Sequence, residues 1–232
     1  MSDKKKQESP LNNLLINILI PTVILSKFSD EEYLGPTLGL IVAVGIPVLY
    51  GIYDYIKTRK VNFFSVMGFV SVLLTGTVGL LELPKEYIAI KEAAIPFIIG
   101  LVVLISMKTK FPLVEKLLYN PTLIRVDKIN ASLEEQGNES IFKKKLNHAT
   151  ILLAFSFFLS AALNFILAKV LIVSDPGTVA FNEELGQMTA WSFVVIAIPS
   201  TLVMFAALWY LIKAIKQCTG LEMEEVLVGV KQ

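Results

Sequence analysis

The stretch Glu82–Met107, ELPKEYIAIKEAAIPFIIGLVVLISM, decides the fold of this chain. Its first part places charged side chains among apolar ones, namely Glu82, Lys85, Glu86, Lys91 and Glu92. It then continues to Met107 without another charged residue. Because a helix needs about 20 residues to cross the hydrocarbon core of a bilayer, this stretch predicts a membrane-spanning helix over residues 88–107, with charged side chains at one end.

The composition of the 232-residue chain is that of an integral membrane protein. Apolar residues make up 54% of it and charged residues 18%, with a mean hydropathy of +0.65, whereas charged residues make up about 25% of a soluble domain. The net charge is only +1, and Cys218 and His148 are the single cysteine and histidine. We therefore predict no nucleic-acid partner, no metal site and no cofactor.

Six apolar runs are long enough to be membrane spans, at about 11–27, 35–56, 63–81, 88–107, 146–173 and 190–215. They lack the two-residue alternation of a barrel and therefore predict helices. We predict an all-α polytopic membrane bundle of six transmembrane helices, forming a single integral membrane domain over residues 1–232. The basic segment before the first run is similar to a secretory signal, but three asparagines, Pro21 and the absence of a small-residue cleavage pattern predict a retained span.

The basic residues predict the orientation, because lysine and arginine concentrate in cytoplasmic loops. If the N-terminus is cytoplasmic, the inner side receives all of the 21 basic residues except Lys27, Lys85, Lys91 and Lys169. Both termini are therefore predicted to be cytoplasmic. The three outer loops, 26–35, 82–89 and 174–188, are rich in carboxylates. These carboxylates are either ordinary solvated loop residues or a mouth that attracts cations.

Two cytoplasmic segments carry further predictions, the amphipathic loop 108–145 and the tail 216–232. Within the loop, the segment 111–121 predicts a short interfacial helix. Thr219 and Glu222 have capping-box spacing and predict a short amphipathic helix in the tail. Three lysines precede the fifth span and predict an anchor at the anionic inner leaflet, with a specific anionic-lipid or partner site as the alternative; they are Lys143, Lys144 and Lys145.

The second span ends with polar residues on one helix face. Tyr50, Asp54 and Lys57 are about one helical turn apart, so their side chains are within hydrogen-bonding reach of one another. Because a charge in hydrocarbon is costly, such residues are functional candidates. The structural alternative is that Asp54 is hydrated and pairs with Lys57.

The fourth span carries the adjacent charges Lys91 and Glu92 at its outer end. Neighbouring helical residues point about 100° apart, so we predict that the two find different partners, Glu82 and Glu86 being candidates for Lys91. Pro96 lacks an N–H and frees the carbonyl of Glu92. The arrangement predicts either a site for a cation or a neighbouring helix, or an interfacial salt bridge beside a tolerated kink.

Three more prolines interrupt predicted spans, and each frees the carbonyl four residues earlier. They are Pro21, Pro47 and Pro199, with the carbonyls of Asn17, Ala43 and Val195. Asn17 and Asn164 also lie within predicted spans, where each needs a hydrogen-bond partner inside the bundle. We expect both asparagines to serve helix packing.

Four short segments carry a family resemblance by their order and spacing. They are Arg59-Lys60-Val61, Lys110-x-Pro112-Leu113-Val114, Lys145-Leu146-Asn147 and Asn164-Phe165. In them the chain resembles the intracellular septation protein A family of small polytopic inner-membrane proteins of Gram-negative bacteria, especially its longer uncharacterised relatives. The resemblance implies an inner-membrane protein of envelope maintenance that contacts division or elongation proteins, and it transfers no catalytic residues.

Together these observations predict a non-enzymatic, multi-pass protein of the bacterial inner membrane that acts in cell-envelope biogenesis or septation through partner binding. The expected partners are the lipid bilayer, membrane division or wall-synthesis proteins, and a second copy of the chain. The alternative is a small transporter of a lipid or small solute, with a polar path at Asp54, Lys91 and Glu92. An enzyme is not expected, because the sequence shows no clustered catalytic residues.

Overall fold

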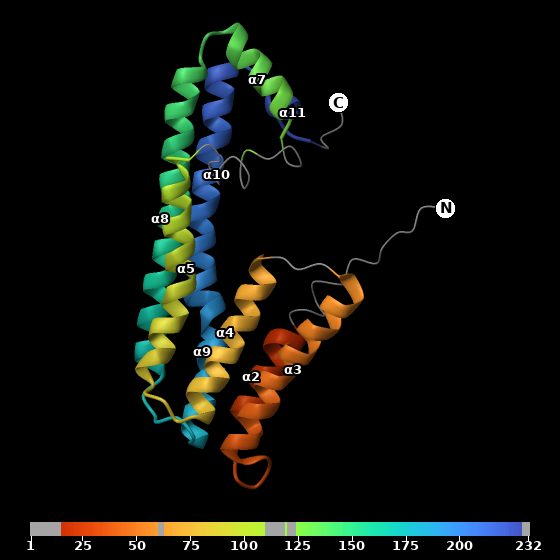
Figure 1. Ribbon diagram of the computed structural model, residues 1–232. Coiled ribbons are helices and arrows are strands. Elements are labelled where there is room, and N and C mark those ends of the chain that lie inside the picture. The colour runs from red at the N-terminus through yellow and green to blue at the C-terminus, as the bar shows by residue number, and fades with distance from the viewer. Residues whose placement is uncertain (1–14, 60–62, 110–118, 120–123, 229–232) are drawn as a thin grey trace, which may run out of the picture. The chain divides into compact units, whose positions relative to one another are not determined.

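The computed structural model describes residues 15–59, 63–109, 119 and 124–228, and it is all-helical over these ranges, without a strand (Figure 1). The helices are η1 (Leu15–Leu19), α2 (Ile20–Lys27), α3 (Gly35–Thr58), α4 (Phe63–Leu80), α5 (Glu86–Ser106), α7 (Val126–Glu135), α8 (Glu139–Leu171), α9 (Val179–Ser192), η2 (Phe193–Ala197), α10 (Ile198–Thr219) and α11 (Met223–Val226), of which η1 and η2 are π-helices. The predicted all-helical class is therefore confirmed for the described part of the chain.

Four helices of the described chain are long and apolar enough to cross a membrane. They are Gly35–Lys57, Glu86–Ser106, Glu139–Leu171 and Val179–Thr219. The predicted spans at 11–27 and 63–81 correspond to shorter apolar helices, Leu15–Lys27 and Phe69–Leu80. The apolar helices indicate a membrane protein. The predicted interfacial helix of 111–121 and the first residues of the span at 11–27 lie outside the described residues.

The helix that contains the predicted sixth span begins earlier than predicted. Residues 179–219 form one continuous helical segment of 41 residues through α9, η2 and α10, so the prediction of a loop up to residue 188 is wrong. The turn at Asp175-Pro176-Gly177 is present, with Gly177 at φ 85°. Thr178 then caps α9 by accepting a hydrogen bond from the Phe181 amide at 3.2 Å. The acidic residues that follow are good helix formers and occupy its first turns.

The helix of the predicted fifth span also extends into a predicted loop. α8 begins at Glu139, so the last residues of the segment 108–145, including the three lysines, are helical. A second helix of that segment, α7, was not predicted. Its buried residues Ile129 and Leu133 are one turn apart and face the protein, which is the helical periodicity that the sequence shows at these positions.

Two of the four prolines follow π-helices. η1 ends at Leu19, two residues before Pro21, and η2 ends at Ala197, two residues before Pro199. Each π-helix therefore contains the residue whose carbonyl the proline cannot bond, four positions earlier. A π-turn accommodates the lost α-helical hydrogen bond by shifting the pairing to i→i+5. Pro47 and Pro96 instead lie inside uninterrupted α-helices.

The residue after each π-associated proline carries a hydroxyl without a partner. Thr22 Oγ1 and Ser200 Oγ are buried and make no hydrogen bond in the described structure. In an α-helix such a hydroxyl ordinarily bonds the carbonyl four residues earlier. For both residues that carbonyl belongs to the preceding π-helix, at positions 18 and 196. The displaced π-helical backbone accounts for the loss of this bond.

The described chain forms two compact units, and three helical segments contribute to both. Unit 1 comprises residues 1–95 and 162–196, and unit 2 comprises residues 96–161 and 197–232. Unit 1 contains η1, α2, α3, α4, α9, η2 up to Ile196, and the adjoining ends of α5 and α8. Unit 2 contains the rest of α5 and α8, with α7, α10 and α11.

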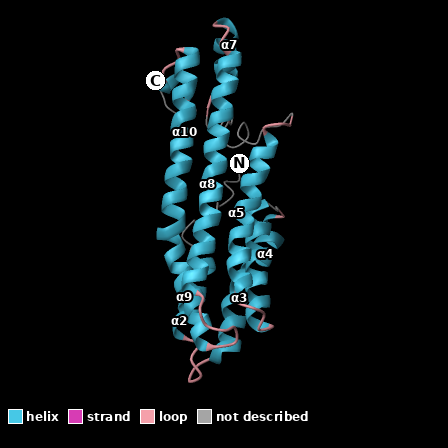
Figure 2. Ribbon diagram, turned by 90° about the vertical axis from the view of Figure 1, so that its left-hand side faces the viewer, coloured by secondary structure: helices cyan, strands magenta, loops and turns pink. Residues whose placement is uncertain are grey.

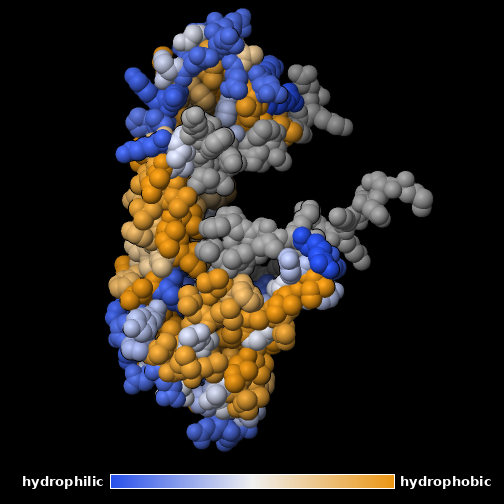
Figure 3. Space-filling model, in the orientation of Figure 1, coloured by the Kyte–Doolittle hydropathy of each residue, from blue (hydrophilic) through white to orange (hydrophobic). Residues whose placement is uncertain are grey.

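Unit 1 is held together by close helix packing at small residues. A Cβ at Gly186 of α9 would lie 2.4 Å from Ser26 Oγ of α2, and one at Gly79 of α4 would lie 2.3 Å from Leu40 of α3. Such approaches are typical of membrane helix pairs. Phe181, which is fully buried, fills the centre of this core. On the face shown in Figure 3, apolar side chains cover α3 and α4.

Unit 2 packs α5, α8 and α10 together, with α8 and α10 running alongside each other (Figures 1 and 2). Gly100 of α5 lets the ring of Phe158 of α8 approach, since a Cβ there would lie 2.9 Å from it. The rest of the core gathers apolar residues of α7, α8, α10 and α11, with the thiol-bearing Cys218 among them at 2% exposure.

Candidate functional site at the turns of unit 1

Three helix-connecting turns of unit 1 come together at one place. Asn182 at the start of α9 donates hydrogen bonds to Ser29 Oγ at 3.1 Å and to the Pro36 carbonyl at 2.7 Å, which joins it to the α2–α3 turn. Lys85 of the α4–α5 turn donates to the Val173 carbonyl and lies 3.3 Å from Asp175, both in the α8–α9 turn. These are the three segments that the sequence predicts on one side of the membrane.

Two of the predicted outer carboxylates are engaged in the fold. Glu184 accepts hydrogen bonds from the Val173 and Ser174 amides at 2.9 Å each and from Ser174 Oγ at 2.7 Å. Asp175 pairs with Lys85. Because these carboxylates satisfy amides and an ammonium at the end of α8, their role is structural. The other acidic residues of the predicted cation-attracting mouth include Asp30, Glu31 and Glu32, which are exposed.

The charges Lys91 and Glu92 pair with each other, contrary to the prediction that they find different partners. The Lys91 ammonium lies 2.5 Å from Glu92 Oε1 and 3.3 Å from Ser71 Oγ of α4. The prediction failed because it used the directions of the Cβ atoms, whereas a lysine side chain has four methylenes and can bend toward a neighbour. The proposed partners were also wrong: Glu82 lies against Gly177, and Glu86 lines a pocket.

The Lys91–Glu92 pair is mostly withdrawn from solvent. The exposed fraction is 8% for the Lys91 side chain and 23% for Glu92. Ionised groups in such a position are tolerated when they are paired and hydrogen-bonded. Ser71 Oγ is uncharged and accepts one further hydrogen bond from the Lys91 ammonium. The three groups form a compact polar cluster near the start of α5.

The remaining candidates from the second and fifth spans lie on α3 and α8. Asp54 and Tyr50 are half-buried, and the Lys57 ammonium lies over the ring of Tyr53, 5.4 Å from its centroid, in a cation–π contact. Asn164 is half-buried on α8. The predicted polar face of Tyr50, Asp54 and Lys57, and the packing role of Asn164, stay predictions.

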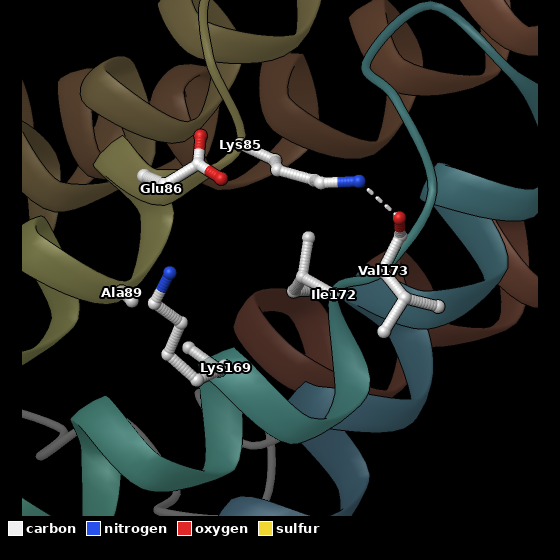
Figure 4. A pocket seen from close by; sticks show the side chains of 7 residues that line it. Lys85, Glu86, Ala89, Lys169, Ile172 and Val173 are labelled. Carbon is white, nitrogen blue, oxygen red and sulfur yellow. Dashed lines mark hydrogen bonds between the residues drawn. The ribbon is translucent and has the colours of Figure 1, made fainter.

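A pocket that the sequence did not predict lies between the first turn of α5 and the last turn of α8, within unit 1 (Figure 4). Its volume is about 180 Å³. Its lining combines three charged side chains with small and aliphatic ones, and the residues are Lys85, Glu86, Ala89, Ala168, Lys169, Ile172 and Val173. A second hollow of about 380 Å³ adjoins it, and it shares Lys85 and Glu86. The sequence did not predict the pocket because Lys169 is far from Lys85 and Glu86 along the chain.

Unit 2 carries a second ordered polar region, which we call the cap: residues 124–138 with α7, and residues 220–228 with α11. Three side chains of the cap bind the last carbonyls of α10. Ser132 and Gln136 donate to the Thr219 carbonyl at 2.9 and 2.6 Å, and Asn138 donates to the Cys218 carbonyl at 3.0 Å. They satisfy backbone groups that a helix end leaves unpaired.

The predicted tail helix is present, but its cap differs from the prediction. α11 has a capping box between Glu222 and Glu225, not between Thr219 and Glu222. Thr219 is instead the last residue of α10. Val226 of α11 is buried at 1% exposure, and its carbonyl accepts from the Arg125 amide at 2.8 Å. The helix therefore packs on the protein.

The three lysines at the start of α8 differ in their surroundings. Lys145 donates to Gln217 Oε1 at 2.8 Å, which ties α8 to α10, while Lys143 and Lys144 are exposed. His148, one turn further, contacts the Lys144 carbonyl through Nδ1 at 2.8 Å. The predicted contact of these lysines with anionic lipid stays a prediction.

Comparison of the chain with protein-family models, with curated proteins and with solved structures finds no match. Within the described ranges, no group of three or more histidine, cysteine, aspartate or glutamate residues is placed to hold a metal ion. The resemblance in sequence order described above stays a prediction.

Proposed function

We propose that this chain is a non-enzymatic, multi-pass protein of a bacterial inner membrane, with six spans and both termini cytoplasmic. It acts in cell-envelope biogenesis or septation by binding a division or wall-synthesis protein. The observation that carries the proposal is the cap of unit 2, a folded polar region at the ends of two helices that are long and apolar enough to span a membrane.

The cap is more elaborate than a connection between spans requires. Ordering a residue costs about 1–2 kcal/mol of backbone entropy, and here the burial of Ile129, Leu133 and Val226 in the core of unit 2 offsets that cost. Two ion pairs also stabilise the cap, Lys128–Glu225 at 2.8 Å and Lys216–Glu222 at 2.7 Å.

The outward surface of the cap carries charges of both signs. Exposed acidic and basic residues of the cap include Asp127, Lys128, Glu134, Glu135 and Glu224, and hydrophilic side chains gather over α7 in Figure 3. A rigid surface with mixed charge suits a protein partner, because charge complementarity gives specificity and fast association.

Site-specific photo-crosslinking tests this proposal in cells. A photoreactive amino acid in place of Glu134, exposed on α7, is expected to form adducts with division or wall-synthesis proteins. The matched control is the same amino acid at Leu202, which is 64% exposed on the apolar surface of α10. A third variant, Ile129→Asp, disrupts the cap and is expected to abolish the adducts at unchanged protein level. Equal adducts at both positions would contradict partner binding through the cap.

The six-span topology has its own test. The meeting of the α2–α3, α4–α5 and α8–α9 turns in unit 1 supports their placement on one side of the membrane. A reporter that is active only in the periplasm is expected to be active when fused after Gly177 and inactive when fused after Gln136. Activity after Gln136 contradicts the proposed orientation.

The second candidate function is a small transporter of a lipid or small solute, with Asp54, Lys91 and Glu92 along its path. The observation in its favour is the buried Lys91–Glu92 pair, because ionised residues within membrane helices often mark transport paths. If Lys91→Ala or Glu92→Ala abolishes uptake into proteoliposomes while crosslinking from position 134 persists, transport replaces the scaffold function. Purified protein that moves no solute removes this candidate.

A further inference from the structure

The pocket of unit 1 holds two opposite charges that are not paired with each other. Lys169, in the last turn of α8, and Glu86, in the first turn of α5, both line it (Figure 4). No ion pair joins the two side chains, and neither makes a hydrogen bond within the described part of the chain. Lys85, the third charge, already binds the Val173 carbonyl and Asp175. Lys169 and Glu86 thus present a donor and an acceptor to whatever occupies the pocket.

Each of the two charges is compatible with its own helix end. Glu86 lies at the positive N-terminal end of α5, and Lys169 lies at the negative C-terminal end of α8. This dipole effect explains why the residue types are tolerated there. The two residues line the cavity from different helices, and both are exposed.

The pocket lies at the polar ends of helices whose flanks are apolar. Next to its lining residues, Ile90 of α5 is 54% exposed and Val170 of α8 is 66% exposed, and Tyr87 is 49% exposed. Both helices are long and apolar enough to cross a membrane. An exposed tyrosine beside aliphatic side chains at such a helix end is typical of the level of lipid headgroups.

The dimensions also favour a headgroup. A volume of about 180 Å³ is below the roughly 300–1,000 Å³ of pockets that enclose drug-sized ligands. It accommodates a small polar group while longer chains remain outside along the apolar flanks. Ala89 and Ala168 are among the lining residues, and their short side chains leave room for such a group.

We propose that this pocket binds the phosphoethanolamine headgroup of a membrane phospholipid. The lipid phosphate accepts hydrogen bonds from the Lys169 ammonium, with Lys85 adding positive charge beside it, and the lipid ammonium donates to the Glu86 carboxylate. The acyl chains lie against the exposed apolar flanks of α5 and α8. This binding is independent of the partner binding proposed for the cap.

The same chemistry distinguishes ethanolamine from other headgroups. A choline group is cationic but has no N–H to donate to Glu86, so it loses the charge-assisted hydrogen bond. A glycerol headgroup carries the phosphate without a cation and leaves the Glu86 charge uncompensated. The pocket is therefore expected to prefer phosphatidylethanolamine to phosphatidylcholine and phosphatidylglycerol.

The test measures lipids retained by the intact protein in native mass spectrometry, after its reconstitution into nanodiscs with equal amounts of the three phospholipids. Wild-type protein is expected to retain phosphatidylethanolamine about tenfold over phosphatidylcholine. Lys169→Gln is expected to lower the retention of every phospholipid. Glu86→Gln is expected to remove the preference for ethanolamine and to keep the phosphate contact. The matched controls are Lys27→Gln and Glu31→Gln, which alter exposed residues of unit 1 away from the pocket.

Soluble phosphoethanolamine, added to the same protein, identifies the source of the ligand. If it fails to displace the lipid at concentrations well above that of the protein, the headgroup belongs to a membrane lipid, as proposed. If it displaces the lipid readily, the pocket is a site for a free zwitterion and the lipid proposal is overturned. Equal retention of the three lipids by wild-type protein, or a Lys169→Gln variant that behaves as Lys27→Gln does, also overturns it.

Discussion

The ion pairs of the two units differ in how far they are exposed to solvent. In unit 1 the Lys91–Glu92 pair is 8% and 23% exposed and lies within a helix that is apolar enough to span a membrane. In unit 2 the Lys128–Glu225 pair joins α7 to α11, and both side chains are more than a third exposed, at 43% and 35%. A buried charge depends on its partner, whereas an exposed charge has water as a substitute. The same type of contact should therefore differ several-fold in its effect on stability.

The largest effect is expected from Glu92→Ala, because it leaves the Lys91 ammonium buried without its carboxylate. We expect a loss of about 3 kcal/mol in the free energy of unfolding, as for other pairs broken on one side. Unfolding of the purified protein by titration of a denaturing detergent measures it. Glu31→Ala, at an exposed carboxylate of the same unit, is the control and should change little. A Glu92→Ala protein as stable as this control would show that the pair is hydrated.

The double variant Lys91→Met with Glu92→Leu sharpens the comparison. It removes both charges and keeps the side-chain volume, so most of the lost stability should return, to within about 1 kcal/mol of the wild type. The same detergent titration measures the recovery. If the double variant is as unstable as Glu92→Ala, the pair contributes through hydrogen bonding or packing that the apolar side chains do not replace.

A smaller effect is expected from Ser71→Ala. The hydroxyl lies 3.3 Å from the Lys91 ammonium, and Glu92 remains to balance the charge. The expected loss is about 0.5–1 kcal/mol. Thr77→Ala, on the same helix, is a suitable control, because that hydroxyl bonds only the Leu73 carbonyl of its own helix in the structure. A loss comparable with that of Glu92→Ala would contradict the assignment of the carboxylate as the main partner.

The smallest effect concerns the exposed pair and depends on pH. The Lys128 ammonium, by its hydrogen bond, and the Glu222 backbone hold the pKa of Glu225 below its ordinary value. Because the folded pKa is lowered, the contact stabilises α11 above the ordinary pKa of a glutamate, and this contribution is lost as the pH falls through the lowered one. The protection factors of the α11 amides, which compare their hydrogen exchange with that of an unfolded chain at the same pH, should therefore fall on acidification. Glu225→Gln should remove this dependence, and Glu224→Gln is the matched control.

Much of the helical content was predictable from the sequence because hydropathy and helical periodicity are local properties. The helix from Glu86 to Ser106 follows directly from the stretch 82–107. The first turns of α9 were not predicted, because Glu183 and Glu184 are polar and resemble loop residues, although Glu184 in fact binds the end of α8.

The candidate sites were less predictable because they depend on contacts between distant segments. Glu86 and Lys169 face one pocket only after α5 and α8 have packed. The pairing of Lys91 with Glu92 depends on the conformation of a long side chain, which residue spacing does not determine. The π-helices were not predicted as such, but the sequence marks both through the proline two residues beyond each.

Cys218 has a practical consequence for work on this protein. The chain has no other cysteine, and this thiol is 2% exposed in the core of unit 2. Buried thiols in apolar surroundings react slowly with alkylating reagents. The native protein should therefore react little with thiol reagents. A single cysteine introduced in a turn of unit 1 or on the cap can then be labelled selectively with a membrane-impermeant maleimide.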